Sequence, residues 1–202
     1  MTGKVFTIFA GVNGAGKSSL YNFENKDFGV RINFDEIIKE NFDHDWSNPA
    51  VQAKAGAMAV RLVKNCLAGS MSFNQETTLT GNVILRNIKK AKENGFRIDL
   101  YYVGLESVEL SIERVDYRKS IGGHGIPEID LRRRYANSFQ NLKVILPICD
   151  VVRIFDNSLN NSIIGMSLEL IVENGEAKYQ NQNMSKYFKD VLSEYLMQIK
   201  TP

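Results

Sequence analysis

The hydrophobic positions of the chain fall into short apolar runs that alternate with longer amphipathic segments. Residues 5–10 and 96–105 are almost continuously apolar and rich in β-branched and aromatic side chains, which is typical of strands buried on both faces. Weaker runs predict three further strands at 29–34, 71–75 and 151–158. Because the strands alternate with helical segments, the pattern indicates a mostly parallel, five-stranded sheet covered by helices on both faces.

The segments between these runs have the periodicity of helices. In SNPAVQAKAGAMAVRLVKNCLAGS, Asn48 is placed to cap a helix and Pro49 to open it, and apolar residues recur on one face. A short helix is possible in EIIKENF, directly after the second strand. Further helices are predicted to begin at 17–19 and to cover 82–94, 107–120 and 128–146.

The C-terminal part of the chain has a different pattern. Asn174-Gly175 predicts the turn of a β-hairpin within SLELIVENGEAKYQ, and an amphipathic helix follows at 185–200. We expect a single domain over residues 1–202, in which 1–158 form the main α/β segment and 159–202 the hairpin and last helix. The apolar stripe of that helix is expected to be core, and consists of Phe188, Leu192, Tyr195 and Ile199.

Composition narrows the possible chemistry. Charged residues make up 24% of the 202 residues and nearly cancel, at a formal net charge of +2, so we expect neither nucleic acid nor a membrane as a partner. Cys66 and Cys149 lack CxxC spacing and are expected to be buried thiols, and two histidines, His44 and His124, are too few for a structural zinc site. The apolar N-terminal run leads into a glycine-rich loop, so we expect a strand rather than a secretion signal, and a cytoplasmic location.

The glycine-rich loop after the first strand carries the strongest motif. Gly11-Val-Asn-Gly-Ala-Gly16-Lys17-Ser18 matches the G-x-x-x-x-G-K-[ST] pattern and lies between a predicted strand and a predicted helix, as phosphate binding requires. Lys17 is expected to reach the β- and γ-phosphates, and the Ser18 hydroxyl to bind Mg²⁺. We therefore expect a P-loop NTPase that binds ATP or GTP through Gly11, Asn13, Gly14, Ala15, Gly16, Lys17, Ser18 and Ser19.

Acidic residues follow two of the predicted strands. Ligands of an open parallel sheet collect at the carboxyl ends of its strands, where Asp35 and Glu76 are expected to lie. Asp35 is a candidate general base for a substrate hydroxyl, and its alternative role is to cap a helix. Glu76 belongs to a polar cluster with Thr77, Thr78 and Thr80, and its alternative role is to cap the helix that starts near Asn82. The later apolar strand IDLYYVG ends without an acid, which disfavours a motor-type ATPase.

Arginines are concentrated on the predicted helix at 107–120 and after it. Ser107, Ser111, Arg114 and Arg118 form a stripe beside the apolar face of that helix, and a glycine-hinged loop, GGHGIP, separates them from the run at 132–134. Phosphoryl transfer needs cations near the γ-phosphate, and arginines on a mobile lid are one way to supply them. The alternative is a solvated basic face, above all for Arg132 and Arg133. His124 has no evident carboxylate partner, so a lid contact or a loop hydrogen bond is expected rather than a role as general base.

Six motifs occur in the order and spacing found in the zeta toxin family, which the chain resembles over about residues 5–158. They are AGVNGAGKSS, INFDEI, SFNQETTLTG, KKAKENGFRIDLYYVGLES, RVDYRKSIGGHGIPEIDLRRRYANSFQNL and RIFDNS. The resemblance implies a kinase-like P-loop fold and a kinase that uses ATP and Mg²⁺ to phosphorylate the 3′-hydroxyl of the sugar in UDP-N-acetylglucosamine. It also implies a separate small antitoxin as a partner.

The resemblance further implies roles for individual residues. Lys17 and Ser18 would bind phosphates and metal, and Asp35 would act as the catalytic base. Some family members carry an arginine where this chain has His124, so the second γ-phosphate cation stays open among Arg114, His124, Arg133 and Arg134. The remaining roles are Arg118 and Arg134 at the γ-phosphate, Asn157 of the Asp156-Asn157-Ser158 run near the nucleotide base, and Asn33, Asp35, Glu76, Thr77 and Thr78 at the sugar nucleotide.

Two alternatives to this function remain open in the sequence. The first is a kinase with another acceptor, such as a nucleoside or a small metabolite. The second is a nucleotide-dependent binding protein that switches a partner surface on its C-terminal helix. For either kind of kinase, ATP rather than GTP is expected as the phosphate donor.

Overall fold

The computed structural model describes residues 3–159 and 165–200. Within them, one sheet has the strand order β2-β3-β1-β4-β5-β6-β7. The strands are β1 Val5–Gly11, β2 Val30–Ile32, β3 Phe73–Thr77, β4 Arg97–Gly104, β5 Val151–Asp156, β6 Ser167–Glu173 and β7 Glu176–Gln180. The helices are α1 Lys17–Glu24, α2 Phe34–Asn41, α3 Pro49–Ala68, α4 Asn82–Glu93, α5 Val108–Ser120, α6 Glu128–Ile145 and α7 Lys186–Leu196, with a 3₁₀ turn at Leu146–Ile148.

The first five strands are parallel to one another, β6 is antiparallel to β5, and β7 is antiparallel to β6. This confirms the α/β fold, the mostly parallel sheet and the C-terminal hairpin, whose turn at Asn174-Gly175 has the positive φ angles of 51° and 78° that such turns need. The expected five-stranded sheet was too small, because β6 pairs with β5 and extends the sheet to seven strands. The hairpin thereby covers the edge that β5 would otherwise expose.

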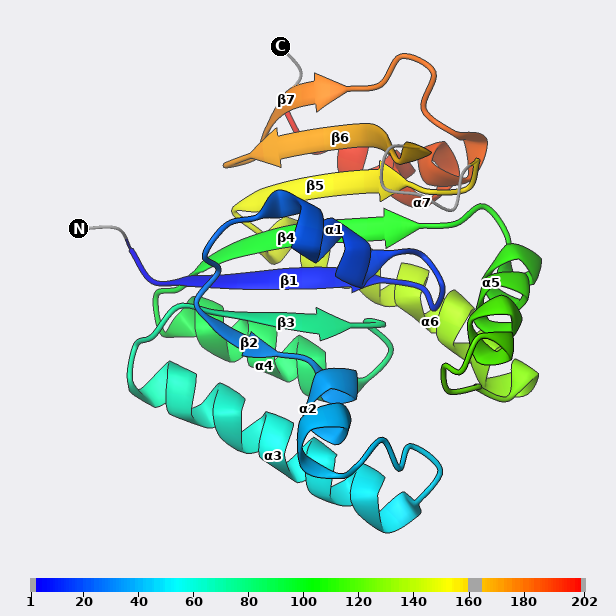
Figure 1. Ribbon diagram of the computed structural model, residues 1–202. Coiled ribbons are helices and arrows are strands. Elements are labelled where there is room, and N and C mark those ends of the chain that lie inside the picture. Colours follow the sequence, from blue (N-terminus) through cyan, green and yellow to red (C-terminus); the bar gives the residue numbers. More distant parts are fainter. Residues whose placement is uncertain (1–2, 160–164, 201–202) are drawn as a thin grey trace.

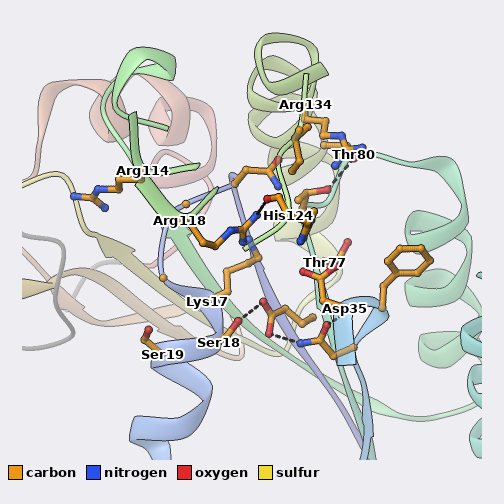
Figure 2. Close-up of a pocket in the computed structure, with 18 of the residues that line it drawn as sticks. Lys17, Ser18, Ser19, Asp35, Thr77, Thr80, Arg114, Arg118, His124 and Arg134 are labelled. Atoms are coloured by element: carbon orange, nitrogen blue, oxygen red, sulfur yellow. Dashed lines mark hydrogen bonds between the residues drawn. The ribbon is translucent and has the colours of Figure 1, made fainter. Parts of the chain in front are cut away.

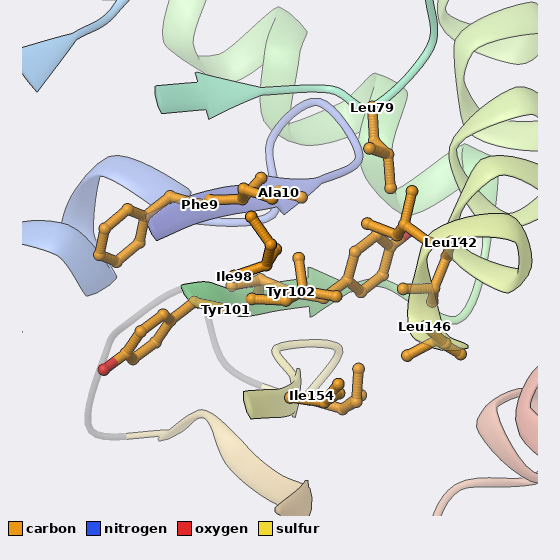
Figure 3. Close-up of a cluster of buried hydrophobic side chains, with 14 of the residues drawn as sticks. Phe9, Ala10, Leu79, Ile98, Tyr101, Tyr102, Leu142, Leu146 and Ile154 are labelled. Atoms are coloured by element: carbon orange, nitrogen blue, oxygen red, sulfur yellow. The ribbon is translucent and has the colours of Figure 1, made fainter. Parts of the chain in front are cut away.

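Helices cover both faces of the sheet (Figure 1). In that view α1 lies in front of the central strands, whereas α6 and α7 lie behind them. An aromatic cluster fills the space under α1, where the rings of Phe9 and Tyr101 stack at 4.9 Å. On the opposite face, Tyr102 is fully buried and its hydroxyl lies 3.0 Å from Ser138 Oγ of α6. Neighbouring residues of β4 therefore anchor opposite layers of the core (Figure 3).

Helix α7 buries the apolar stripe that the sequence indicates. Phe188 and Leu192 are both fully buried, and Tyr195 packs against the same core. Gly104 permits this packing, because a Cβ at that position would lie 2.5 Å from the Phe188 ring. The helix ends at Leu196 rather than Lys200, since the last residues leave the helix and Lys200 pairs with Glu176 of β7. The stripe is therefore part of the core. It is not exposed as the partner surface that a nucleotide-dependent binding protein would need on this helix.

Three strands differ from their predicted bounds by two residues at one end or both, and two of these differences affect the site. β2 ends at Ile32, because the Asn33 side chain accepts a hydrogen bond from the Asp35 N–H and starts α2. β3 is shifted to Phe73–Thr77, so Glu76 lies within the strand and not after it. The third difference is β5, which ends at Asp156 before Asn157 and Ser158. Propensity alone does not resolve such boundaries, because pairing with neighbouring strands decides them.

Both cysteines are free thiols, as expected. Cys66 is buried and Cys149 half-buried, and burial raises the pKa of both thiols. Among residues 3–159 and 165–200, no helix combines the length and apolar character needed to cross a bilayer.

The hairpin offers a test of the single-domain organisation. Val172→Ala in β6 removes two buried methyl groups and is expected to lower the free energy of unfolding by about 1–2 kcal/mol, at about 0.8 kcal/mol per buried CH₂. The free energy of unfolding is measured by denaturant unfolding and followed by the fluorescence of Trp46, the single tryptophan. Trp46 lies outside the hairpin, so it reports on the rest of the domain. A lower midpoint in one transition is expected. An unchanged Trp46 transition would mean that the hairpin unfolds as a separate unit.

Candidate active site

The P-loop connects β1 to α1 in a conformation that depends on glycine. Gly11 has a φ of 143°, and a Cβ there would lie 2.0 Å from the carbonyl oxygen of Val103. Gly16 has a φ of 94° and begins α1 without a side-chain cap, so the first N–H groups of the helix have no side-chain acceptor at that position. Unsatisfied N–H groups at a helix N-terminus form an anion site.

Lys17 lies at the start of α1 with only 9% of its surface exposed. Its Nζ donates to the Val12 carbonyl oxygen at 3.0 Å. Burial lowers the pKa of Lys17, while Glu76 and Asp35 partly offset this effect. The ammonium group therefore sits in a poorly hydrated position that an anionic ligand would stabilise.

A cavity of about 720 Å³ opens beside the P-loop. Its walls come from the P-loop, α2, β3, α5, the loop after α5, and α6 (Figure 2). Gly11, Ala15 and Asn157 do not line it; Asn157 is buried and donates through Nδ2 to the Ala15 carbonyl oxygen at 2.9 Å. The expected site residues that do line it are Asn13, Gly14, Gly16, Lys17, Ser18, Ser19, Asn33, Asp35, Glu76, Thr77, Thr78, Arg118 and Arg134.

Glu76 contacts the P-loop directly. Its Oε1 accepts a hydrogen bond from Ser18 Oγ at 2.8 Å, and its Oε2 accepts from Arg31 at 2.7 Å and from Asn33 Nδ2 at 3.0 Å. The alternative role as a cap of α4 is wrong, since Gly81 begins that helix without a side-chain cap. Glu76 thus belongs to the phosphate side of the cavity as much as to the acceptor side.

Asp35 lies in the first turn of α2 and faces the cavity opposite Lys17 (Figure 2). Its alternative role as a helix cap is wrong, because Asn33 caps α2. The Asp35 side chain is exposed, and no residue in the described part of the chain donates a hydrogen bond to it. Both carboxylate oxygens are therefore available to accept the proton of a substrate hydroxyl.

The threonines after β3 lie in a strained turn. Leu79 is fully buried with a φ of 59°, an uncommon conformation for a bulky residue. Its N–H donates to Thr77 Oγ1 at 3.0 Å, and its carbonyl oxygen accepts from Asn141 of α6 at 2.8 Å. The hydroxyls of Thr78 and Thr80 lie 2.9 Å apart. This turn holds a row of hydroxyl groups at the cavity wall, and backbone strain of this kind is concentrated at functional sites.

The arginines divide into two groups. Arg118 is half-buried at the end of α5 and Arg134 lies on α6, and both line the cavity. Arg114 also touches the cavity wall, but it is buried and donates to the carbonyl oxygen of Asn157 at 2.7 Å. Arg132 pairs with Glu109 and Glu128, and all three are exposed. Arg133 also lines the cavity, but it is exposed and pairs with the half-buried Asp130. Arg132 is thus part of a solvated face, while Arg118 and Arg134 are best placed to meet a ligand.

His124 makes the lid contact that we expected. Its ring stacks on Trp46 of the α2–α3 loop, with centroids 5.4 Å apart and planes inclined by 15°. Burial lowers the pKa of His124, Arg118 and Arg134 lower it further, and Asp35 opposes the shift. A lowered pKa disfavours the charged imidazolium, so His124 is a weaker candidate for the second γ-phosphate cation than the arginines that line the cavity.

Several residues in and next to the cavity were not identified from the sequence. Phe34 lines the cavity but was given no role within INFDEI, and Trp46, which stacks on the lining residue His124, lies in a loop without a motif. Arg31 and the fully buried Asn74 lie on β2 and β3, where the Arg31 NH1 group donates to Asn74 Oδ1 at 3.1 Å. The sequence did contain a sign that Arg31 is important. It is the single charged residue inside the apolar run GVRINF, and a buried charge requires a partner.

The residues present fit a magnesium ion that binds together with a nucleotide. In the part of the chain that the structure describes, no group of three or more His, Cys, Asp or Glu side chains could hold a metal ion. Mg²⁺ commonly takes one or two protein oxygens and completes its shell with water and phosphate oxygens. Ser18 Oγ and the Glu76 carboxylate, in contact at 2.8 Å, supply oxygens of this type.

Comparisons with known proteins bear on the fold. No family model matches the chain. A Haemophilus influenzae protein described as uncharacterized is 35% identical over 128 residues, which cover 63% of this chain and 89% of that protein.

Three solved structures have similar folds. The chain aligns with a chain of the PezAT toxin-antitoxin system of Streptococcus pneumoniae (TM-score 0.63, 17% identity, 98% of this chain and 86% of the other). It aligns with a chain of AvrRxo1-ORF1:-ORF2 with ATP (TM-score 0.66, 16% identity, 99% and 64%) and with one of the Pnkp1/Rnl/Hen1 RNA repair complex (TM-score 0.53, 19% identity, 71% and 47%). This chain thus spans less than two thirds of the length of the AvrRxo1-ORF1:-ORF2 chain and of the RNA repair chain. The chain belongs to one family with the Haemophilus influenzae protein and has the fold of the zeta toxin-like P-loop kinases.

Proposed function

We propose that the protein is a kinase that uses ATP and Mg²⁺ to phosphorylate a sugar hydroxyl of a nucleotide sugar, with UDP-N-acetylglucosamine as the first candidate. One observation carries the proposal. The carboxylate of Asp35 lies without a hydrogen-bond donor from the described residues, across a single cavity from Lys17 and Ser18. A base that faces a phosphate-binding loop is the arrangement that phosphoryl transfer to a hydroxyl requires.

In this proposal the P-loop residues hold the donor. Lys17 binds the β- and γ-phosphates, and Ser18 with Glu76 would hold Mg²⁺, which neutralises developing phosphate charge when it is bound. Arg118 and Arg134 reach the γ-phosphate from the opposite wall and stabilise the charge that spreads over its oxygens. Asn157, which bonds to the Ala15 carbonyl, lies under the P-loop on the side proposed for the nucleotide base.

The acceptor lies on the other side of the cavity. Asp35 accepts the proton of the attacking hydroxyl, and Asn33, Glu76, Thr77 and Thr78 orient the sugar nucleotide. The volume of about 720 Å³ is within the range of ordinary ligand pockets. In this proposal the donor phosphates lie beside the P-loop and the acceptor sugar lies beside Asp35.

The related folds support this proposal in part. The AvrRxo1-ORF1:-ORF2 structure contains ATP, and the PezAT structure is described as a toxin-antitoxin system. By analogy, we propose ATP as the donor and a separately encoded small antitoxin as a partner.

A substrate screen tests the proposal. Purified protein is incubated with ATP, Mg²⁺ and one acceptor at a time, and phosphorylated products are identified by mass spectrometry. UDP-N-acetylglucosamine and other nucleotide sugars are compared with nucleosides and small metabolites. A phosphorylated nucleotide sugar is expected. Phosphorylation of only a nucleoside or metabolite would overturn the substrate proposal and keep the kinase, whereas ATP consumption with no acceptor product would overturn both.

A further inference from the structure

Arg31 is a charged residue in the middle of the short strand β2. Only 16% of its side chain is exposed, and its guanidinium lies over the ring of Tyr21 of α1, 3.6 Å from the ring centroid. None of the roles proposed above uses it. A guanidinium buried to this extent must be balanced by partners of opposite charge.

The guanidinium engages groups from two elements at once, α2 and β3. NH2 donates to Glu76 Oε2 at 2.7 Å and to Glu36 Oε1 at 3.0 Å, and Nε lies 3.2 Å from Glu36 Oε2. NH1 donates to Asn74 Oδ1 at 3.1 Å. Each of the three guanidinium nitrogens is thus occupied, and the fork geometry of arginine uses all of them.

The two carboxylates that Arg31 binds are held close together. Asn33 Nδ2 donates to Glu36 Oε1 and to Glu76 Oε2, both at 3.0 Å. Two negative groups that share one amide would repel each other without a cation between them. Arg31 supplies that cation, and so the direction in which Glu76 points depends on it.

Glu76 presents its other oxygen, Oε1, to the Ser18 hydroxyl. Glu36 directly follows Asp35 in α2. Arg31 is therefore connected on one side to the hydroxyl and carboxylate proposed for Mg²⁺, and on the other side to the helical turn that carries the proposed base.

We infer that Arg31 is a positioning residue for the magnesium–nucleotide side of the site: it holds the Glu76 carboxylate against the Ser18 hydroxyl and ties this pair to the first turn of α2. The inference rests on the proposed use of a magnesium nucleotide, but it does not depend on which acceptor is phosphorylated. Residues that orient metal ligands typically contribute 10–100-fold to metal affinity or activity.

Arg31→Lys tests the inference, because lysine keeps the charge and loses the fork that spans both carboxylates. Binding of a non-hydrolysable ATP analogue is measured by calorimetry with and without Mg²⁺. We expect the affinity in Mg²⁺ to fall about 10-fold or more, and the affinity without Mg²⁺ to remain that of the wild type. The magnesium-free affinity and the melting temperature report whether the variant is folded.

Arg153→Lys is the matched control. Arg153 is also a strand arginine over a tyrosine ring, 5.0 Å from the Tyr101 centroid, but its carboxylate partner is Glu173 at 3.8 Å and not Glu76, which bonds to Ser18. The same substitution there is expected to leave the magnesium dependence unchanged. An equal loss in both variants would mean that Arg31 has only a structural role.

A double-mutant cycle provides the second measurement. Glu76→Gln is expected to reduce the magnesium-dependent affinity, and adding Arg31→Lys to it is expected to cost little more, since both act through one carboxylate. Additive losses, or wild-type magnesium dependence in Arg31→Lys, would overturn the inference. If no nucleotide sugar is phosphorylated and the cycle still shows coupling, the acceptor proposal fails while the role of Arg31 stands.

Discussion

Asp35→Asn is expected to lower the rate of phosphoryl transfer by about 10²–10⁴-fold, the usual contribution of a general base, with little change in ATP affinity. The amide has nearly the same shape as the carboxylate but cannot take up the proton of the attacking hydroxyl. Asn33, which caps α2, keeps its hydrogen bond to the backbone of residue 35, so the helix start is preserved. Single-turnover product formation and nucleotide binding, measured in parallel, separate the chemical step from donor binding.

Asp190→Asn is the matched control for this variant. Asp190 is exposed on α7, outside the cavity, and its substitution is expected to leave turnover unchanged. Wild-type rates in Asp35→Asn would remove Asp35 from the mechanism and leave its exposed carboxylate without a proposed role.

Lys17→Met is expected to reduce turnover by about 10²–10³-fold, the typical cost of removing one charged donor from a developing anion. The same change is expected to maintain or raise the melting temperature. The reason is that burial lowers the pKa of Lys17, so the folded state disfavours the charged form that the unfolded chain carries. Because the unfolded state binds the proton more tightly, the wild type should gain stability as the pH rises toward the ordinary lysine pKa of 10.5, and this gain should be absent from the variant.

Thermal denaturation at several pH values, together with turnover, tests both parts. Lys189→Met, an exposed position on α7, is the control and is expected to change neither measurement. A lower melting temperature in Lys17→Met would contradict the view that the buried Lys17 destabilises the folded state and is needed for ligand binding.

The hydrophobic pattern predicted the order and type of the main elements correctly. Long apolar runs such as β4 are explained by burial on both faces, which local sequence reports directly. The ends of β2 and β3 were predicted less well. The Asn33 cap that starts α2 is a local signal, because Asn33 bonds to the N–H of Asp35, but the β-branched run before it extended the predicted strand too far. The ends of β3 are decided by its pairing with β1, a partner that lies outside any short window of sequence.

The hairpin and last helix illustrate the same limit. The turn at Asn174-Gly175 and the stripe of α7 were readable as local patterns. That β6 would extend the sheet instead of forming a separate ribbon follows from the edge of β5, which exists only once the parallel strands have assembled.

The P-loop and its place between a strand and a helix could be predicted from the sequence alone, because glycine conformations and a neighbouring lysine and serine are local requirements. What the loop faces depends on the folding of the whole chain. The tertiary structure bonds Glu76 to Ser18, places Asp35 across the cavity, stacks His124 on Trp46, and inserts Arg31 between two carboxylates. These contacts join residues on different strands, helices and loops, and their geometry arises from the packing of the sheet, which no local pattern specifies.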